Sequence, residues 1–329
     1  MAISDIDPSV IKLAKRLYNK NQCELPVDVA SILAGRANVK YIEIPFKCDG
    51  LSVNLKLPGK KPTVFIRPGS VENRKRFTLA HELAHVVIPW HTGHILDNIT
   101  DHNGDLDFAY WVMESEANAF ASEFLMPSDY MENIISEYGP DNYGFILTTI
   151  SEKCKVSIPA ALLRSITFMP KNNIVSMAYG EKYETYRSPK TAVHGIVGRG
   201  LFDLGQDSLP NGIKYEFEIG PYRFAHWNFP CKLPLPAAPP NEDWRSLLHL
   251  ATSSLWVAPE EVHAIKNKVS AIISSVNSSL RHSFDEEEIY AQFVHRISTD
   301  DVLSEMLTLT KFHQYAAVRI GEFVKKRQR

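Results

Sequence analysis

The fold and the chemistry of this chain are decided by the stretch His81-Glu82-Leu83-Ala84-His85. In an α-helix, residues four apart lie on the same face one turn from each other, so His81 and His85 can both direct an imidazole nitrogen at one metal ion. Glu82 then projects beside the metal, where it can take a proton from a metal-bound water. This H-E-x-x-H spacing is typical of zinc metallopeptidases, and it predicts a metal site with a general base beside it.

The residues around these five predict a buried helix over residues 72–88, which stops at Pro89 because proline cannot continue a helix. A buried imidazole needs a polar partner, which a metal ion would supply. Core histidines satisfied by hydrogen bonds are the alternative. The apolar side chains of this helix are those of Phe77, Leu79, Ala80, Leu83, Ala84, Val86 and Val87.

A catalytic zinc site also needs a third protein ligand and an open position for water. His91 has the spacing of the third histidine in H-E-x-x-H-x-x-G-x-x-H. That pattern requires a glycine at position 88 to turn the chain back, whereas this sequence has Ile88 followed by Pro89. The sequence therefore does not support the turn that would bring His91 to the metal.

Glu114 is the other candidate, on a helix that we expect over about residues 108–125. Asn118 lies one turn further on, so the carboxylate could bind the metal while the amide holds a ligand histidine in place. Glu116 points about 160° away from that pair. We expect Glu116 to be a solvated residue of an acidic helix start.

Three separate motifs, in this order, resemble the ImmA/IrrE family of metallopeptidases. They are RFTLAHELAH at 76–85, E-x-E-A-N-x-F-A at 114–121 and Leu-Met-Pro at 125–127, and the resemblance covers roughly residues 10–168. In that family the metal is held by the two motif histidines and a glutamate eleven positions before the leucine, which implies His81, His85 and Glu114 here. Zinc is the expected ion, and the same ligands also suit manganese or iron.

The resemblance also implies a function. Family members cleave a helix-turn-helix transcriptional repressor and thereby induce stress-response, mobile-element or phage-defence genes, so a repressor is the expected substrate. A signal ligand, with nucleic acid as one candidate class, is expected at the C-terminal half. The alternative is a ligand- or DNA-sensing regulator with a peptidase fold and little hydrolysis. The presence of Glu82 beside intact ligands favours the enzyme.

We expect an α+β fold in three parts. Residues 1–169 would form a gluzincin-like metallopeptidase domain, a small mixed sheet plus active-site helices, with a helix-turn-helix-like segment at 143–168. Residues 170–258 would form an α/β sensor-like domain similar to the GAF-like sensors of some family members. Residues 259–329 would form a helical C-terminal region. The proline-rich stretch 230–240 is the best linker candidate.

Further elements follow from the hydrophobic periodicity and from the turn residues. In the first half we expect helices at 8–20 and 26–33, strands at 39–44, 51–57 and 63–66, and two short helices within 143–167. In the second half we expect strands at 174–179 and 213–217, and helices at 244–255, 259–278, 286–296 and 300–325.

The segment Gly50-Leu51-Ser52-Val53 corresponds to a strand that borders the cleft in the resembled family. A substrate could pair with it as an added strand, and an ordinary edge strand is the alternative. Cys48 lies next to this segment. Its thiolate could occupy the open metal position as an inhibitory ligand, and a packed or surface thiol is the alternative.

Peptide hydrolysis also needs a hydrogen-bond donor for the oxyanion. We expect this donor in the stretch that follows the H-E-x-x-H helix. Tyr110 and His94 are the first candidates, and His91 and His102 are the second. Loop histidines are usually solvated, which is the alternative for each.

Charge and composition narrow the function classes. The net charge is −2 over 329 residues, with a pI near 6.6, which gives no global reason to expect nucleic-acid binding. The N-terminal residues are acidic where a secretory signal is basic, and no apolar run is long enough to span a bilayer. We therefore expect a cytoplasmic protein without a membrane partner.

Overall fold

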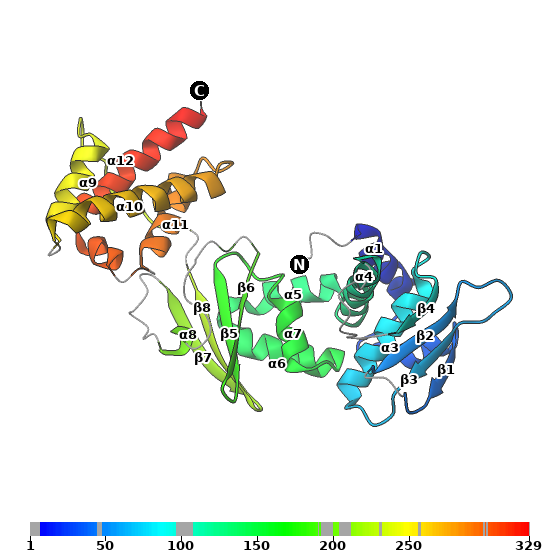
Figure 1. Cartoon of the computed structure of the whole chain (residues 1–329). Coiled ribbons are helices and arrows are strands. Elements are labelled where there is room, and N and C mark those ends of the chain that lie inside the picture. The colour runs from blue at the N-terminus through cyan, green and yellow to red at the C-terminus, as the bar shows by residue number, and fades with distance from the viewer. Residues whose placement is uncertain are drawn as a thin grey trace. The chain divides into compact units, whose positions relative to one another are not determined.

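The computed structural model describes residues 7–44, 48–96, 108–189, 191, 200–203, 212–229, 232–255, 258–298, 300 and 302–328. The chain divides into two compact units, Met1–Phe168 and Met169–Arg329, and each is described by itself (Figure 1). Among the helices of the described residues, none is long and apolar enough to cross a membrane.

A four-stranded mixed sheet forms one layer of the first unit. Its strands are β1 (Asn38–Tyr41), β2 (Gly50–Leu55), β3 (Thr63–Ile66) and β4 (Gly93–Leu96), in the order β1-β3-β2-β4. β1 is parallel to β3, and the other pairs are antiparallel. The expected α+β class with a small mixed sheet is thus confirmed.

β2 lies inside this sheet, paired with β3 through Gly50–Val53 and with β4 through Leu51 and Ser52. Its backbone groups therefore already bond to two neighbours. The prediction that a substrate strand adds to Gly50-Leu51-Ser52-Val53 is wrong, because β4, which that prediction lacked, covers the second edge.

The described residues of the first unit also form seven helices. They are α1 (Pro8–Lys20), α2 (Val29–Ala34), α3 (Glu72–Val87), α4 (Phe108–Leu125), α5 (Ser128–Tyr138), α6 (Tyr143–Cys154) and α7 (Ile158–Ser165), with a short 3₁₀ turn, η2 (Pro140–Asn142). α3 packs against β2 and β3 on one side and against α4 on another (Figure 1). This places the H-E-x-x-H helix between the sheet and the next helix, as its apolar residues require.

Two helical predictions in this unit need correction. α2 begins at Val29 and not at residue 26, because the Asp28 side chain caps it by accepting a hydrogen bond from the Ser31 amide at 3.1 Å. α5 was not predicted as a separate helix. α6 and α7 agree with the two short helices expected there, and the buried hydrogen bond of 2.8 Å between Tyr143 and Ser165 joins them.

The second unit starts with an antiparallel sheet of β5 (Asn173–Tyr179), β6 (Lys182–Arg187), β7 (Ile213–Ile219) and β8 (Tyr222–Asn228), ordered β6-β5-β8-β7, beside the short helix α8 (Gly200–Asp203). β6 and β8 were not predicted. Each follows its partner through a tight turn at Gly180 or Gly220, both with positive φ, a conformation that glycine adopts readily.

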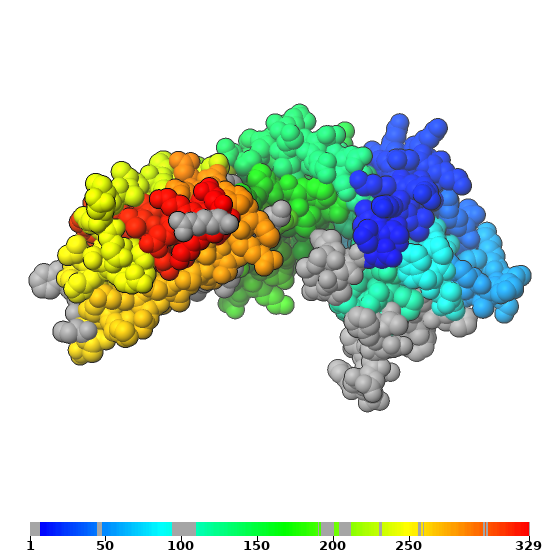
Figure 2. Space-filling model, turned by 90° about the horizontal axis from the view of Figure 1, so that it is seen from above, coloured from blue at the N-terminus to red at the C-terminus, as the bar shows by residue number. Residues whose placement is uncertain are grey.

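Helices α9 (Trp244–Ser253), α10 (Pro259–Ser279), α11 (Glu286–Ser298) and α12 (Thr310–Arg327) share one hydrophobic core in this unit. Figure 2 shows α12 in red beside the yellow and orange atoms of the earlier helices. α9 belongs to this core, although its sequence was grouped with the sensor-like segment. The predicted single helix 300–325 is wrong: a 3₁₀ turn, η4 (Leu303–Thr308), comes first, and Leu309 is extended.

Candidate metal centre

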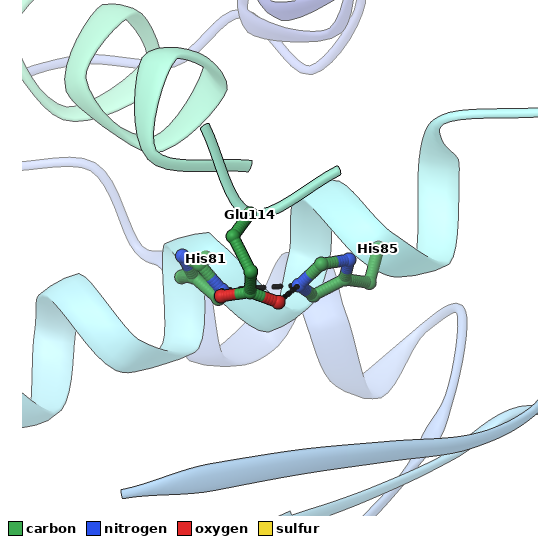
Figure 3. A group of neighbouring side chains, drawn as sticks. All are labelled: His81, His85 and Glu114. Atoms are coloured by element: carbon green, nitrogen blue, oxygen red, sulfur yellow. Dashed lines mark hydrogen bonds and ion pairs between the residues drawn. The ribbon is translucent and has the colours of Figure 1, made fainter. Parts of the chain in front are cut away.

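Three predicted ligand side chains meet at one point of the first unit (Figure 3). His81 and His85 project from α3, and Glu114 reaches them from α4. The two Nε2 atoms are 3.0 Å apart, and the Glu114 carboxylate oxygens lie 3.2 Å from His81 Nε2 and 3.4 Å from His85 Nε2. Both histidines are buried, and Glu114 is half-buried.

These distances fit a bound metal. Tetrahedral ligands at about 2.0–2.1 Å from zinc lie about 3.3 Å from one another, close to all three separations found here. At most one of the two facing Nε2 atoms can donate a proton to the other. Glu114 Oε1 is buried and, within the described residues, accepts no hydrogen bond. A cation would balance this group of acceptor atoms.

The ionisation states also suit metal ligation. Burial lowers the pKa of His85 to about 4, so its imidazole is neutral near pH 7. Burial alone would raise the pKa of Glu114, but the facing imidazoles of His81 and His85 outweigh burial and lower that pKa to about 2. Neutral imidazoles and an ionised carboxylate are the forms that bind a metal.

Asn118 supports the first histidine. Its Oδ1 atom lies 3.0 Å from His81 Nδ1, which leaves His81 Nε2 directed at Glu114. The i, i+4 spacing on α4 thus places Glu114 and Asn118 on either side of one imidazole, as expected from the helix geometry.

Glu82 directly follows the ligand His81 on α3 and is 1% exposed. The hydroxyl of Ser52 on β2 donates a hydrogen bond to Glu82 Oε2. Gly50, two residues earlier on the same strand, faces the same carboxylate. The segment predicted to bind substrate therefore holds the candidate general base instead, a role that the sequence did not indicate.

His91 and Glu116 form a second layer that the sequence analysis missed. His91 Nδ1 lies 2.8 Å from His85 Nδ1, and His91 Nε2 lies 2.9 Å from Glu116 Oε2. Burial lowers the pKa of His91, and the hydrogen bond with Glu116 opposes that shift. Glu116 is 5% exposed, so the expectation that it is solvated is wrong.

The conformation of the chain after the end of α3 explains why His91 reaches His85 and Glu116. Ile88 is extended, and the His91 amide donates to the Ile88 carbonyl at 3.3 Å, so the chain turns back despite Pro89. The turn brings His91 behind His85 and against Glu116 on α4. The nearness of His91 to the motif and the E-x-E spacing were the available signals.

The other predicted site residues are not part of the cluster. In the described part of the chain, His81, His85 and Glu114 alone form a group of three or more ligand atoms within 4.8 Å of one another. Cys48 is buried and lines a separate cavity with Asp49 and Arg67, which gives no support to an inhibitory metal bond.

The oxyanion candidates are placed only in part. Tyr110 lies one turn before Glu114 on α4. The backbone of His94 belongs to β4, while its side chain lies outside the described residues, as does the whole of His102. The oxyanion roles therefore stay predictions.

A cavity of about 450 Å³ lies beside Asn118 and is not lined by any of the three candidate ligands. Its wall includes Asn118, which contacts His81, and Phe77, one turn before His81 on α3. Most of the remaining wall is apolar, including Ala119, Met126 and Leu163. Such a cavity can accept an apolar side chain.

Comparison with known proteins finds similarity over parts of this chain. Residues 34–165 match the family described as the IrrE N-terminal-like domain. A segment of 89 residues is 30% identical to the radiation response metalloprotease IrrE of Deinococcus deserti, covering 27% of this chain and 30% of that protein. A solved structure of a Mycobacterium tuberculosis transcriptional regulator aligns with a TM-score of 0.42 and 12% identity, over 68% of this chain and 88% of that chain.

The family match includes the whole cluster of His81, His85 and Glu114 together with Glu82. The donor set and its spacing fit a metal, and the metalloprotease match implies one. Over residues 34–165, this chain therefore resembles the ImmA/IrrE family of metallopeptidases.

Proposed function

We propose that the first unit is a zinc-dependent, site-specific endopeptidase. The observation that carries this proposal is the convergence of His81, His85 and Glu114 at 3.0–3.4 Å, with the Glu82 carboxylate held beside them. Two histidines and one carboxylate are the ligand set of a catalytic zinc that keeps a position open.

In the proposed reaction, zinc held by these three side chains would lower the pKa of a water molecule and polarise the scissile carbonyl. Glu82 takes the proton of the attacking water and delivers it to the leaving amine nitrogen. The hydrogen bond from Ser52 fixes the orientation of the Glu82 carboxylate. Asn118 keeps the His81 ring aligned.

We place a substrate side chain next to the cleaved bond in the apolar cavity beside Asn118. The proposed substrate is a helix-turn-helix transcriptional repressor, whose cleavage induces stress-response, mobile-element or phage-defence genes. The family resemblance and the stress-related name of the Deinococcus relative support this choice. A signal ligand, with nucleic acid as one class, would act through the second unit.

Co-expression with the regulator encoded nearest to this chain tests the proposal. Wild type is compared with Glu82→Gln, which keeps the volume of the side chain and removes its basicity, while DNA damage or phage infection is applied. We expect cleavage of the regulator by the wild type alone. An intact regulator in both strains under every stress would contradict the peptidase proposal. Equal induction of the genes by both proteins would favour the non-hydrolytic regulator.

A further inference from the structure

We propose that His91 and Glu116 are positioning residues that fix the protonated nitrogen of His85 and thereby direct its Nε2 lone pair at the metal. The proposal rests on the metal centre of the proposed function and not on its proteolytic activity. The buried side chains of His85, His91 and Glu116 form a continuous series of hydrogen bonds, which ends at the Glu116 carboxylate.

The hydrogen bonds form a continuous series from His85 to Glu116. His85 Nδ1 lies 2.8 Å from His91 Nδ1, and His91 Nε2 lies 2.9 Å from Glu116 Oε2. The indole of Trp90 donates to the same Glu116 oxygen at 2.7 Å. His85 and His91 are fully buried, and Glu116 is 5% exposed, so water does not replace these bonds easily.

The donor and the acceptor of each hydrogen bond in this series follow from the chemistry of the groups at its two ends. An ionised carboxylate can only accept hydrogen bonds, so His91 must donate its Nε2–H to Glu116. A neutral His91 then offers Nδ1 as an acceptor, and His85 must donate Nδ1–H to it. The remaining nitrogen of His85, Nε2, carries a lone pair and faces Glu114.

The two ligand histidines are therefore held differently. His81 bonds to Asn118, a neutral side chain that carries both an acceptor and a donor and could present either to the ring. The hydrogen bonds from His85 through His91 end at the carboxylate of Glu116. Their donor-to-acceptor direction therefore cannot reverse unless a proton is added. The second nitrogen of a metal-bound histidine usually bonds to a carboxylate or a carbonyl, and here a second histidine relays that role.

Nitrogen NMR of protein labelled at its histidines tests the proposal without any substrate. In zinc-free wild-type protein at neutral pH, we expect a neutral His85 with its proton on Nδ1 and a neutral His91 with its proton on Nε2. A proton on Nε2 of His85, or a doubly protonated His91, would overturn the proposal.

Zinc titration against a competing chelator gives an independent measure. His91→Leu removes the acceptor, and we expect zinc to bind about 10–100-fold more weakly. His91→Gln restores a carbonyl acceptor and should recover most of the affinity. His263→Leu, at an exposed histidine of α10, is the matched control and should bind zinc like the wild type. Circular dichroism confirms that each variant folds.

Wild-type zinc affinity in a folded His91→Leu protein would contradict the positioning role. Equal losses in His91→Leu and His91→Gln would contradict it as well, because packing rather than the acceptor would then matter. A protein that passes both tests yet cleaves no regulator would contradict only the proposed peptidase function.

Discussion

Gly50 lies against the carboxylate of Glu82. A Cβ atom added at position 50 would lie 2.9 Å from Glu82 Cδ and 2.9 Å from the side-chain methyl of Thr78, closer than real Cβ contacts. β2 thus approaches α3 so closely at this point that a glycine is required. The requirement is steric, because the space for a methyl group is already filled by the candidate general base.

Gly50→Ala should therefore displace Glu82 and reduce peptide cleavage by about 100-fold, the cost of a misplacement of about 1 Å. Zinc content should stay unchanged, since the ligands lie elsewhere on α3 and α4. Gly35→Ala is the control, because a Cβ there meets its nearest atoms at an ordinary 3.7 Å. Steady-state kinetics and metal analysis check this, and unimpaired turnover in Gly50→Ala would contradict it.

Ser52→Ala should lower kcat by about tenfold, since a hydrogen bond to a charged group contributes about 1.5–3 kcal/mol and part of this is recovered by relaxation. KM and zinc affinity should not change, because Ser52 contacts Glu82 and not the ligands. Ser176→Ala, at a buried strand serine of the second unit, is the matched control. A loss of zinc in Ser52→Ala would contradict the assigned contact.

Zinc should raise the thermal stability of the chain. A ligand at 100 times its Kd stabilises the folded state by about 2.7 kcal/mol. Glu114→Ala should remove most of this gain while leaving the zinc-free protein folded. Calorimetry with and without zinc measures the difference, and an unchanged zinc-induced shift in Glu114→Ala would show that Glu114 is not a ligand.

The zinc-free protein should lose stability as the pH falls from about 6.5 towards about 4. The pKa of His85 is lowered from 6.5 to about 4 by burial, so in this window the unfolded chain binds a proton that the folded chain does not. The loss is about 3 kcal/mol at most. The lowered pKa of Glu114 adds a loss of the same sign below about pH 4.5.

Urea unfolding of the zinc-free protein between pH 8 and pH 4 measures this slope. In His85→Gln the part of the slope between pH 6.5 and pH 4.5 should shrink, because the buried titrating group is gone. A slope that does not differ from that of the wild type would contradict the assignment to His85.

Lys155→Gly should stabilise the first unit by about 0.5–1 kcal/mol. Lys155 ends α6 with a φ of 53°, a left-handed conformation that is strained for any residue with a Cβ. Lys153→Gly, in the last turn of the same helix, should have the opposite sign and cost about 1 kcal/mol. Chemical denaturation of both variants gives the comparison, and destabilisation by Lys155→Gly would contradict it.

The sequence by itself determined what lies within single helices. The i, i+4 spacing places His81 and His85 on one face of α3, and the same spacing relates Glu114 to Asn118 on α4. Helical periodicity is local, so these pairs could be derived without knowing how the helices pack. The apolar residues around the motif likewise indicated that α3 is buried.

Only the tertiary structure decided the contacts between segments. Gly50 and Ser52 contact Glu82 because β2 packs against α3. β2 is an inner strand because β4 pairs with its second edge. His91 reaches His85 because the chain turns back after Ile88 and α4 brings Glu116 to meet it. Such contacts depend on backbone turns and packing of residues distant in sequence, which residue spacing does not encode.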